Sequence, residues 1–242
     1  MPRFFVDGMQ SGSQFIVLTG ANAAHAKVLR LRRGEHVTVC DGCGTDYYCV
    51  ISDISPDQVC LVVERQCRAE SEAHIFASVY MGFAKGDKVE HVIQKATELG
   101  AGEIVVYPSS RCVVKMTGEA LKKKLIRWEK IAASAAEQSG RGCIPQVLTL
   151  SSYEKMLERA AAADKAIFFY ENETKHTLSS VLSGTFSSVA LITGPEGGFS
   201  PEEAKMAAAA GLDICTLGRR ILRCETAPLC ALSAVMYAAG EY

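Results

Sequence analysis

From residue 74 onward, short apolar runs alternate with segments whose apolar residues recur at helical spacing. This alternation constrains the fold most, because strands separated by helices pair in parallel and the helices then cover the sheet. We expect strands at residues 75–81, 104–107, 166–170, 189–192 and 214–217. We expect helices at residues 88–99, 119–138, 152–162, 201–210 and 225–239, with a shorter one at 177–182. The sequence therefore predicts an α/β domain built on a mostly parallel sheet.

The first 70 residues follow a different pattern, in which short strands are separated by Gly, Asp, Asn and Pro turns. The expected strands lie at residues 4–6, 15–18, 37–40, 47–54 and 59–64, with one short helix at 23–31. This indicates a small β-rich domain, a barrel. Residues 65–72 are polar and are interpreted as a linker, so we expect two domains, 1–70 and 73–242.

Composition narrows the class of protein. The chain is 48% hydrophobic and 22% charged, and no apolar run reaches the ~20 residues of a membrane helix. The N-terminus lacks the apolar core of a secretory signal, so we expect a cytoplasmic protein. The ten cysteines contain one C-x-x-C, at 40–43, whose centre is a turn, and we expect buried thiols and no metal site. A net charge of −1 gives no global sign of nucleic-acid binding.

Two strand-to-helix loops carry an unusual density of glycine and charge. The first, GPEGG at 194–198, follows an apolar run, and Ser200 with Glu203 then forms a predicted capping box. The second, GRRILRCETA at 218–227, places three arginines and a glutamate before an apolar helix. In open α/β sheets ligands bind at the carboxyl ends of the strands, where both loops are expected. We therefore interpret the two loops as one binding site.

Familiar catalytic motifs are missing from both loops. The sequence has no G-x-x-x-x-G-K-[ST], no G-x-G-x-x-G, no G-x-S-x-G and no H-E-x-x-H. These absences argue against P-loop ATPases, Rossmann dehydrogenases, serine hydrolases and zinc proteases of the usual kinds.

The helix at 88–99 has a strong apolar stripe and a predicted start. Asp87 and Glu90 have the spacing of a capping box. The polar side chains along its other side are predicted to be solvated; they are Lys88, His91, Lys95 and Glu98.

The run ITGPEGGFSPEE followed by LGRRILRCETAPLCAL resembles the two signature motifs of the RsmE family of SPOUT-class methyltransferases. Further matches are His25 with VLR at 28–30, KG at 85–86, KATELG at 95–100, Arg111 with VV at 113–114, and EQSGR at 137–141. The resemblance covers both expected domains. One departure is Cys224, where the family usually has threonine.

The resemblance implies an enzyme that methylates N3 of uridine 1498 in 16S ribosomal RNA, with S-adenosyl-L-methionine as the cofactor. It also implies an RNA-binding PUA-like N-terminal domain and a C-terminal SPOUT domain with a trefoil knot. Such proteins work as homodimers, with the cofactor pocket near the subunit interface, and act on the assembled 30S subunit. Neither a membrane nor a metal is implied.

Site residues follow from mapping these motifs onto the chain. The cofactor would contact Tyr170, Leu191, Thr193, Gly194, Glu196, Gly197, Leu217, Gly218, Ile221 and Leu222. Glu225 is a candidate proton acceptor or could orient an arginine, and Arg219 or Arg223 could stabilise charge on the base. The RNA would be held by Arg3, Lys27, Arg30, Arg32, Arg111, Lys115 and Arg141.

Three alternatives remain open. A related knotted enzyme could methylate ribose 2′-oxygen instead of the base. A non-catalytic RNA-binding or ribosome-assembly protein could retain the pocket without turnover. A generic α/β domain with no RNA role is the third, although two charged glycine-containing loops are hard to explain by packing alone.

Overall fold

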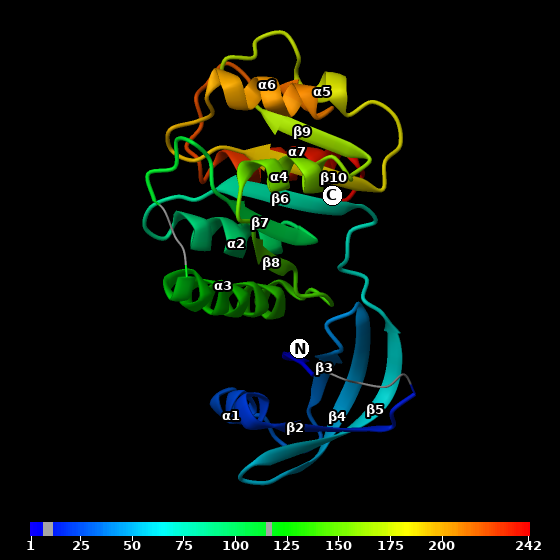
Figure 1. Ribbon diagram of the computed structural model, residues 1–242. Coiled ribbons are helices and arrows are strands. Elements are labelled where there is room, and N and C mark those ends of the chain that lie inside the picture. The colour runs from blue at the N-terminus through cyan, green and yellow to red at the C-terminus, as the bar shows by residue number, and fades with distance from the viewer. Residues whose placement is uncertain (7–11, 115–117) are drawn as a thin grey trace. The chain divides into compact units, whose positions relative to one another are not determined.

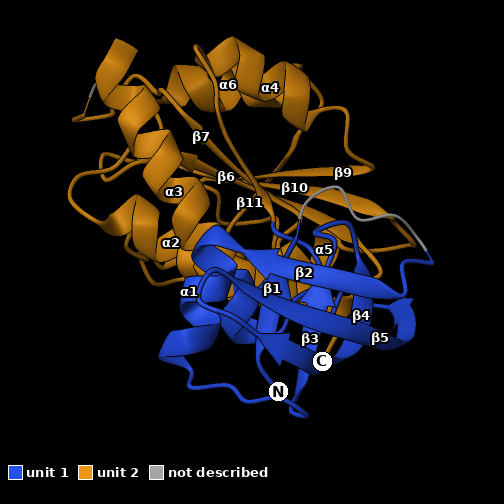
Figure 2. Ribbon diagram, turned by 90° about the horizontal axis from the view of Figure 1, so that it is seen from below, with its two compact units in different colours: residues 1–72, 136–144 blue, residues 73–135, 145–242 orange. Residues whose placement is uncertain are grey.

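The computed structural model describes residues 1–6, 12–114 and 118–242 and divides into two compact units (Figure 2). The N-terminal unit consists of Met1–Glu72 together with Ala136–Ile144. The C-terminal unit consists of Ala73–Ala135 and Pro145–Tyr242.

The N-terminal unit is built on one curled five-stranded sheet (Figure 1). Its strand order is β1-β3-β4-β5-β2, from β1 (Arg3–Phe5), β2 (Phe15–Thr19), β3 (His36–Cys40), β4 (Thr45–Ile54) and β5 (Gln58–Arg68). Apart from the parallel β1–β3 pair, neighbouring strands are antiparallel. Alternate residues of β2 are buried, as expected for a sheet with one face on a core. Helix α1 (Gly20–Val28) contributes Ala26 to that core, which includes Phe4, Val37, Val39, Tyr47, Cys49 and Leu61.

The segment 136–144 completes this unit. Arg141 is 4% exposed, and its Nη2 lies 2.6 Å from Glu72 Oε2. The Gly44 N–H donates to the Gly142 carbonyl oxygen at 3.3 Å. The predicted linker at 65–72 is wrong for its first four residues, because β5 continues to Arg68 and pairs with β4 that far.

The C-terminal unit contains a six-stranded sheet whose recorded pairings are all parallel (Figure 1). Its order is β11-β9-β10-β6-β7-β8, from β6 (Phe76–Gly82), β7 (Glu103–Tyr107), β8 (Gln146–Thr149), β9 (Lys165–Phe169), β10 (Ser188–Thr193) and β11 (Asp213–Cys215). The predicted α/β class is confirmed. The edge strand β8 was not among the predicted strands. The trefoil knot stays a prediction.

Helices cover both faces of this sheet (Figure 2). The helices are α2 (Lys88–Glu98), α3 (Gly118–Ser139), α4 (Tyr153–Ala160), α5 (Leu178–Val181), α6 (Pro201–Ala209) and α7 (Ala227–Ala238). Helices α4 and α6 pack with Tyr80, Phe168 and Ile192 in one core. Helices α2 and α7 contact each other and pack on β6, β7 and β10. Because successive side chains of a strand point to opposite faces, continuous burial of β6 and β10 requires a helix layer on each side.

One start signal was predicted wrongly. Asp87 precedes α2 but makes no side-chain cap hydrogen bond. Glu90 turns away from the helix start, because its carboxylate accepts from Lys124 Nζ at 2.9 Å and from Arg127 Nη2 at 2.6 Å. Two cations on α3 therefore hold the residue that was expected to complete the cap.

The strand order decides where the functional loops lie. Strands β9 and β10 are adjacent, and β11 pairs with β9 on its other side. Since all three run parallel, the segments that follow them gather at one edge of the sheet.

Candidate functional site

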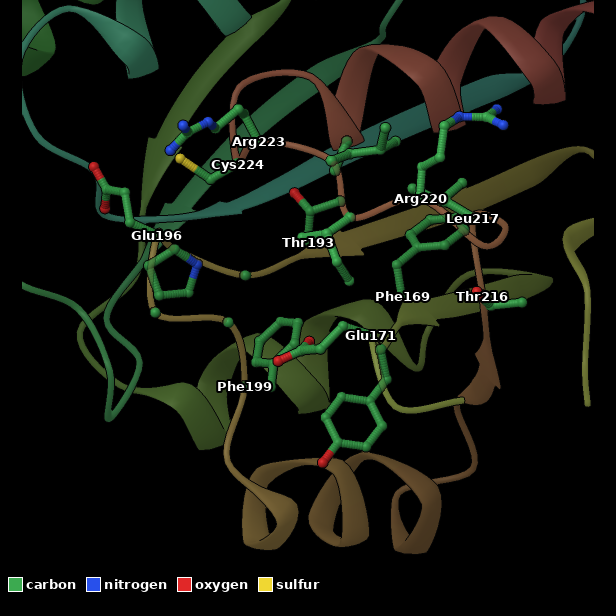
Figure 3. Close-up of a pocket in the computed structure, with 18 of the residues that line it drawn as sticks. Phe169, Glu171, Thr193, Glu196, Phe199, Thr216, Leu217, Arg220, Arg223 and Cys224 are labelled. Atoms are coloured by element: carbon green, nitrogen blue, oxygen red, sulfur yellow. The ribbon is translucent and has the colours of Figure 1, made fainter. Parts of the chain in front are cut away.

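A cavity of about 500 Å³ lies at the carboxyl ends of β9, β10 and β11 (Figure 3). We call residues 194–199 the first loop and residues 216–226 the second loop. The wall consists of the end of β9 and the residues after it, both loops, and the starts of two helices. Its residues are Lys88, Phe169, Tyr170, Glu171, Thr193, Gly194, Pro195, Glu196, Gly197, Gly198, Phe199, Thr216, Leu217, Gly218, Arg220, Ile221, Leu222, Arg223, Cys224 and Ala227.

Thr193 ends β10 and fixes the point where the first loop leaves the sheet. Its Oγ1 donates to the Tyr80 carbonyl oxygen at 3.0 Å, and its own carbonyl oxygen accepts from the Tyr107 hydroxyl at 2.9 Å. Pro195 then packs on the end of β6, where a Cβ added to Gly82 would lie 2.7 Å from Pro195 Cδ. The start of the first loop is therefore held by β6, which pairs with β10, and by Tyr107 of β7, the next strand along.

The end of the first loop is held by the capping box predicted from the sequence, which is confirmed. Ser200 Oγ accepts from the Glu203 N–H at 3.1 Å, and Glu203 Oε2 accepts from the Ser200 N–H at 2.8 Å. The second carboxylate oxygen of Glu203 accepts from the Ser110 N–H at 2.8 Å. One buried carboxylate thus fixes both the start of α6 and the segment after β7.

Glycines let other residues approach the first loop closely. A Cβ on Gly197 would lie 2.9 Å from the Arg111 carbonyl oxygen, and Arg111 Nη1 donates to the Gly197 carbonyl oxygen at 3.3 Å. Gly198 has φ 65°, and a Cβ there would lie 2.3 Å from Glu171 Oε1. Alanine at 198 would be strained by the positive φ and would also require the exposed Glu171 side chain to turn aside.

The second loop has no helix or strand and is shaped by short-range hydrogen bonds. Thr216 Oγ1 and Gly218 exchange hydrogen bonds of 3.1 Å, and the Thr216 N–H donates to the His176 carbonyl oxygen. The Arg223 carbonyl oxygen accepts from the N–H groups of Thr226 and Ala227, which leads the chain into α7. Arg223 and Cys224 lie on the side of Glu196, whereas Arg220 and Leu217 lie toward Phe169 (Figure 3).

Lys88 joins the two loops. Its ammonium lies 3.4 Å from Glu196 Oε1 in the first loop and 3.3 Å from Glu225 Oε2 in the second. It also donates to Cys224 Sγ at 3.7 Å. Burial acts to lower the pKa of Lys88, but the Cys224 sulfur and the two carboxylates outweigh it and raise the pKa above its ordinary value. Lys88 is therefore charged at neutral pH.

The thiol next to Lys88 is neutral at neutral pH, whereas the two carboxylates next to it are ionised. Burial and the hydrogen bond to Glu225 raise the pKa of Cys224 to about 11, so it is a neutral thiol that donates to Glu225 Oε2 at 3.2 Å. Burial also acts to raise the pKa of Glu225, but its own N–H, Cys224 and Lys88 more than offset this and lower it. For Glu196, the Lys85 N–H at 2.8 Å and Lys88 likewise outweigh burial and lower the pKa. Both carboxylates are ionised at neutral pH.

Two known domain families match the chain. The RNA methyltransferase domain covers residues 71–236, and the RNA methyltransferase PUA domain covers residues 18–64. A ribosomal RNA small subunit methyltransferase E from Bacillus subtilis is 36% identical over 249 residues, which span 98% of this chain and 96% of that protein. The chain belongs to the ribosomal RNA small subunit methyltransferase E family.

Solved structures of a methyltransferase E protein and of a putative methyltransferase share this fold. The Neisseria gonorrhoeae protein, crystallised bound to S-adenosyl methionine, is 31% identical with a TM-score of 0.86 and covers 98% of this chain and 97% of its own. A putative methyltransferase from Legionella pneumophila, in complex with the bound cofactor SAM, is 30% identical with the same TM-score and coverage. The family predicted from the two motifs is confirmed.

Most of the residues that the methyltransferase E resemblance assigned to the cofactor line the cavity. Nine of the ten line it. Leu191 does not, because it is fully buried within β10. Arg223 lines the cavity, while Arg219 and Glu225 are not among the described residues of its wall. Sequence reasoning missed Lys88, because a polar residue in the first turn of an amphipathic helix has the pattern of a solvated face.

The basic residues assigned to RNA in this methyltransferase E member fall into two groups. Arg3 and Arg141 form ion pairs within the N-terminal unit: Arg3 Nη1 lies 2.6 Å from Asp46 Oδ1, and Arg141 pairs with Glu72. The exposed ones are Lys27, which donates to the Pro56 carbonyl oxygen, and Arg30, Arg32 and Arg111. Lys115 lies outside the described residues.

Other chemistry predicted from composition can be placed on the structure. All ten cysteines are free thiols in the described part of the chain. Within residues 1–6, 12–114 and 118–242, no group of three or more His, Cys, Asp or Glu side chains could hold a metal ion. Among the same residues, no helix combines the length and hydropathy needed to cross a membrane.

Proposed function

We propose that this chain transfers a methyl group from S-adenosylmethionine to N3 of uridine 1498 in 16S ribosomal RNA. The observation that carries the proposal is the single cavity formed by both signature loops at the ends of β9, β10 and β11. Membership of the methyltransferase E family and the S-adenosyl methionine bound by the Neisseria relative support it.

The cavity wall suits this cofactor. Leu217, Ile221 and Leu222 offer apolar surface for an adenine ring. The carboxylates of Glu171 and Glu196 favour a ligand with net positive charge and can accept hydrogen bonds from hydroxyl or ammonium groups. Gly218 has φ 105° and nothing within 4 Å of an added Cβ, so its backbone is open to a ligand. When bound, S-adenosylmethionine supplies a methyl group activated by its sulfonium.

The chain's own residues would prepare the uracil. N3 of uridine must lose a proton, and negative charge then spreads onto O2 and O4. Arg223 is in the wall and can stabilise that charge, with Arg219 as the second candidate. Glu225 is ionised and can accept a proton, although its lowered pKa makes it a weak base. If Glu225→Gln leaves the methylation rate unchanged across pH, Glu225 is not the base.

The N-terminal unit is proposed to bind RNA, as its PUA family suggests. Lys27, Arg30 and Arg32 would contact phosphates there, and Arg111 would do so beside the first loop. Arg3 and Arg141 would support the fold behind them. A homodimer acting on the assembled 30S subunit in the cytoplasm is part of the same proposal. Two large side chains of the C-terminal unit, Ile221 and Tyr237, are 80% and 74% exposed, and burial of either in a subunit interface would fit this part of the proposal.

Nucleoside analysis tests the proposal directly. The full chain is incubated with methyl-labelled S-adenosylmethionine and with small subunits from cells that lack this protein, and the RNA is then digested. We expect 3-methyluridine, mapped to position 1498. Ribose 2′-O-methylation would identify the other knotted enzyme class. Binding of S-adenosylmethionine without any transfer would identify a non-catalytic assembly protein.

A further inference from the structure

We propose that Lys88 is a positioning residue that holds the second loop against the first and so keeps the cavity assembled. The inference rests on the proposed function, in that the assembled cavity is taken to bind S-adenosylmethionine. Lys88 lies outside both signature loops, at the first position of α2, yet it lines the cavity.

The geometry is that of one cation between two anions from separate segments. The Lys88 ammonium lies within 3.4 Å of the Glu196 carboxylate and 3.3 Å of the Glu225 carboxylate. The three side chains are 22–28% exposed, so water screens them only in part. Without Lys88, two like charges would face each other across the junction of the loops, which is unfavourable.

The two carboxylates depend on Lys88 to different degrees. Glu196 Oε1 also accepts from the Lys85 N–H at 2.8 Å, and its loop is fixed by the Ser200–Glu203 capping box. Glu225 has the Cys224 thiol, which belongs to the same loop, as its other side-chain partner. Removal of Lys88 should therefore release the second loop, while the first stays in place.

Because Glu225 depends more on Lys88 than Glu196 does, a variant at 225 can distinguish a positioning role of Lys88 from direct contact between Lys88 and the cofactor. If Lys88 acts through Glu225, its effect on cofactor affinity should shrink when Glu225 is already neutral. If Lys88 instead contacts the ligand itself, the effect should persist whatever residue stands at 225. Lys95 provides the matched control. It is on the same helix, its Nζ lies 2.7 Å from Glu98 Oε1, and it is not among the described residues that line the cavity.

The test compares the full-length wild type, Lys88→Met, Lys88→Arg, Lys95→Met, Glu225→Gln and the double variant Lys88→Met/Glu225→Gln. Calorimetric titration with S-adenosylmethionine should show affinity about tenfold weaker for Lys88→Met, since a charge-assisted contact is lost. Lys88→Arg should recover most of it, and Lys95→Met should match the wild type. In the Glu225→Gln background, Lys88→Met should change affinity by less than about threefold.

Hydrogen exchange in the absence of cofactor gives a readout that does not depend on the proposed function. Lys88→Met should accelerate exchange in residues 217–227 and leave residues 194–200 unchanged, whereas Lys95→Met should alter neither segment. Unchanged exchange in Lys88→Met, or an equal loss of affinity with glutamate and glutamine at 225, would overturn the inference. A wild type that binds no S-adenosylmethionine would instead refute the proposed function, while the exchange result would still judge the role of Lys88 in holding the loop.

Discussion

Replacing Gly82 with alanine tests how strictly the end of β6 positions the first loop. Gly82 does not have a positive φ, so the substitution is a steric change. The added Cβ would lie 2.7 Å from Pro195 Cδ and 2.8 Å from Pro195 N. Because such atoms normally approach to about 3.5 Å, Pro195 must move by roughly 0.8 Å. Overpacking of this kind costs about 1–3 kcal/mol, and here the cost falls on the loop that lines the cavity.

Titration with S-adenosylmethionine measures the effect. If the cofactor needs the loop in its present place, the dissociation constant of Gly82→Ala should rise about 5- to 150-fold, which corresponds to that cost. Gly102→Ala is the matched control. Its Cβ would lie 2.5 Å from the Phe76 ring, which is 51% exposed and can turn aside, at the opposite end of the strands. Equal affinity for Gly82→Ala and the wild type would refute the reasoning.

Three further outcomes concern stability. Ser200→Ala removes a capping acceptor and should lower the unfolding free energy by about 1 kcal/mol in urea titrations. Arg141→Ala leaves the Glu72 carboxylate, whose side chain is 13% exposed, with only the N–H groups of Gly142 and Cys143 as donors and should lower the unfolding free energy by about 1–3 kcal/mol, whereas loss of RNA affinity with unchanged stability would contradict this. Hydrogen bonds from Ser187 and the Ser188 N–H lower the pKa of Asp164 from 3.8 to about 2. Because the folded pKa lies below the ordinary value, Asp164→Asn should destabilise above pH 4, with the difference vanishing as the pH falls toward 2.

The sequence predicted those parts of the fold that local pattern determines. The strand before the first loop and the Ser200 capping box depend on neighbouring residues, and they lie where expected. The strand before the second loop is also present, but it ends at Cys215, two residues earlier than predicted. Strand β8 was missed because it is four residues long, follows Pro145 and has only one fully buried side chain, Val147.

The remaining errors concern contacts between residues distant in sequence. Lys88 reaches the site because β6 pairs with β10, an order that no local pattern reveals. Arg141 was assigned to RNA from its charge and position, and its ion pair with Glu72, 69 residues earlier in the chain, was not visible in the local pattern. Asp87 and Glu90 had the residue types and spacing of a capping box, but Glu90 forms ion pairs with Lys124 and Arg127 of α3 instead.

The return of residues 136–144 to the N-terminal unit bears on how the chain folds during synthesis. A ribosome that has completed only the first 72 residues has not yet made Arg141, which pairs with Glu72, or Gly142, which binds Gly44. The N-terminal unit therefore cannot form these two contacts before β6, α2, β7 and α3 have also been synthesised. A fragment that ends at residue 72 would retain the core of the sheet but lack the partner of Glu72, and we expect it to be more sensitive to proteolysis than the full chain.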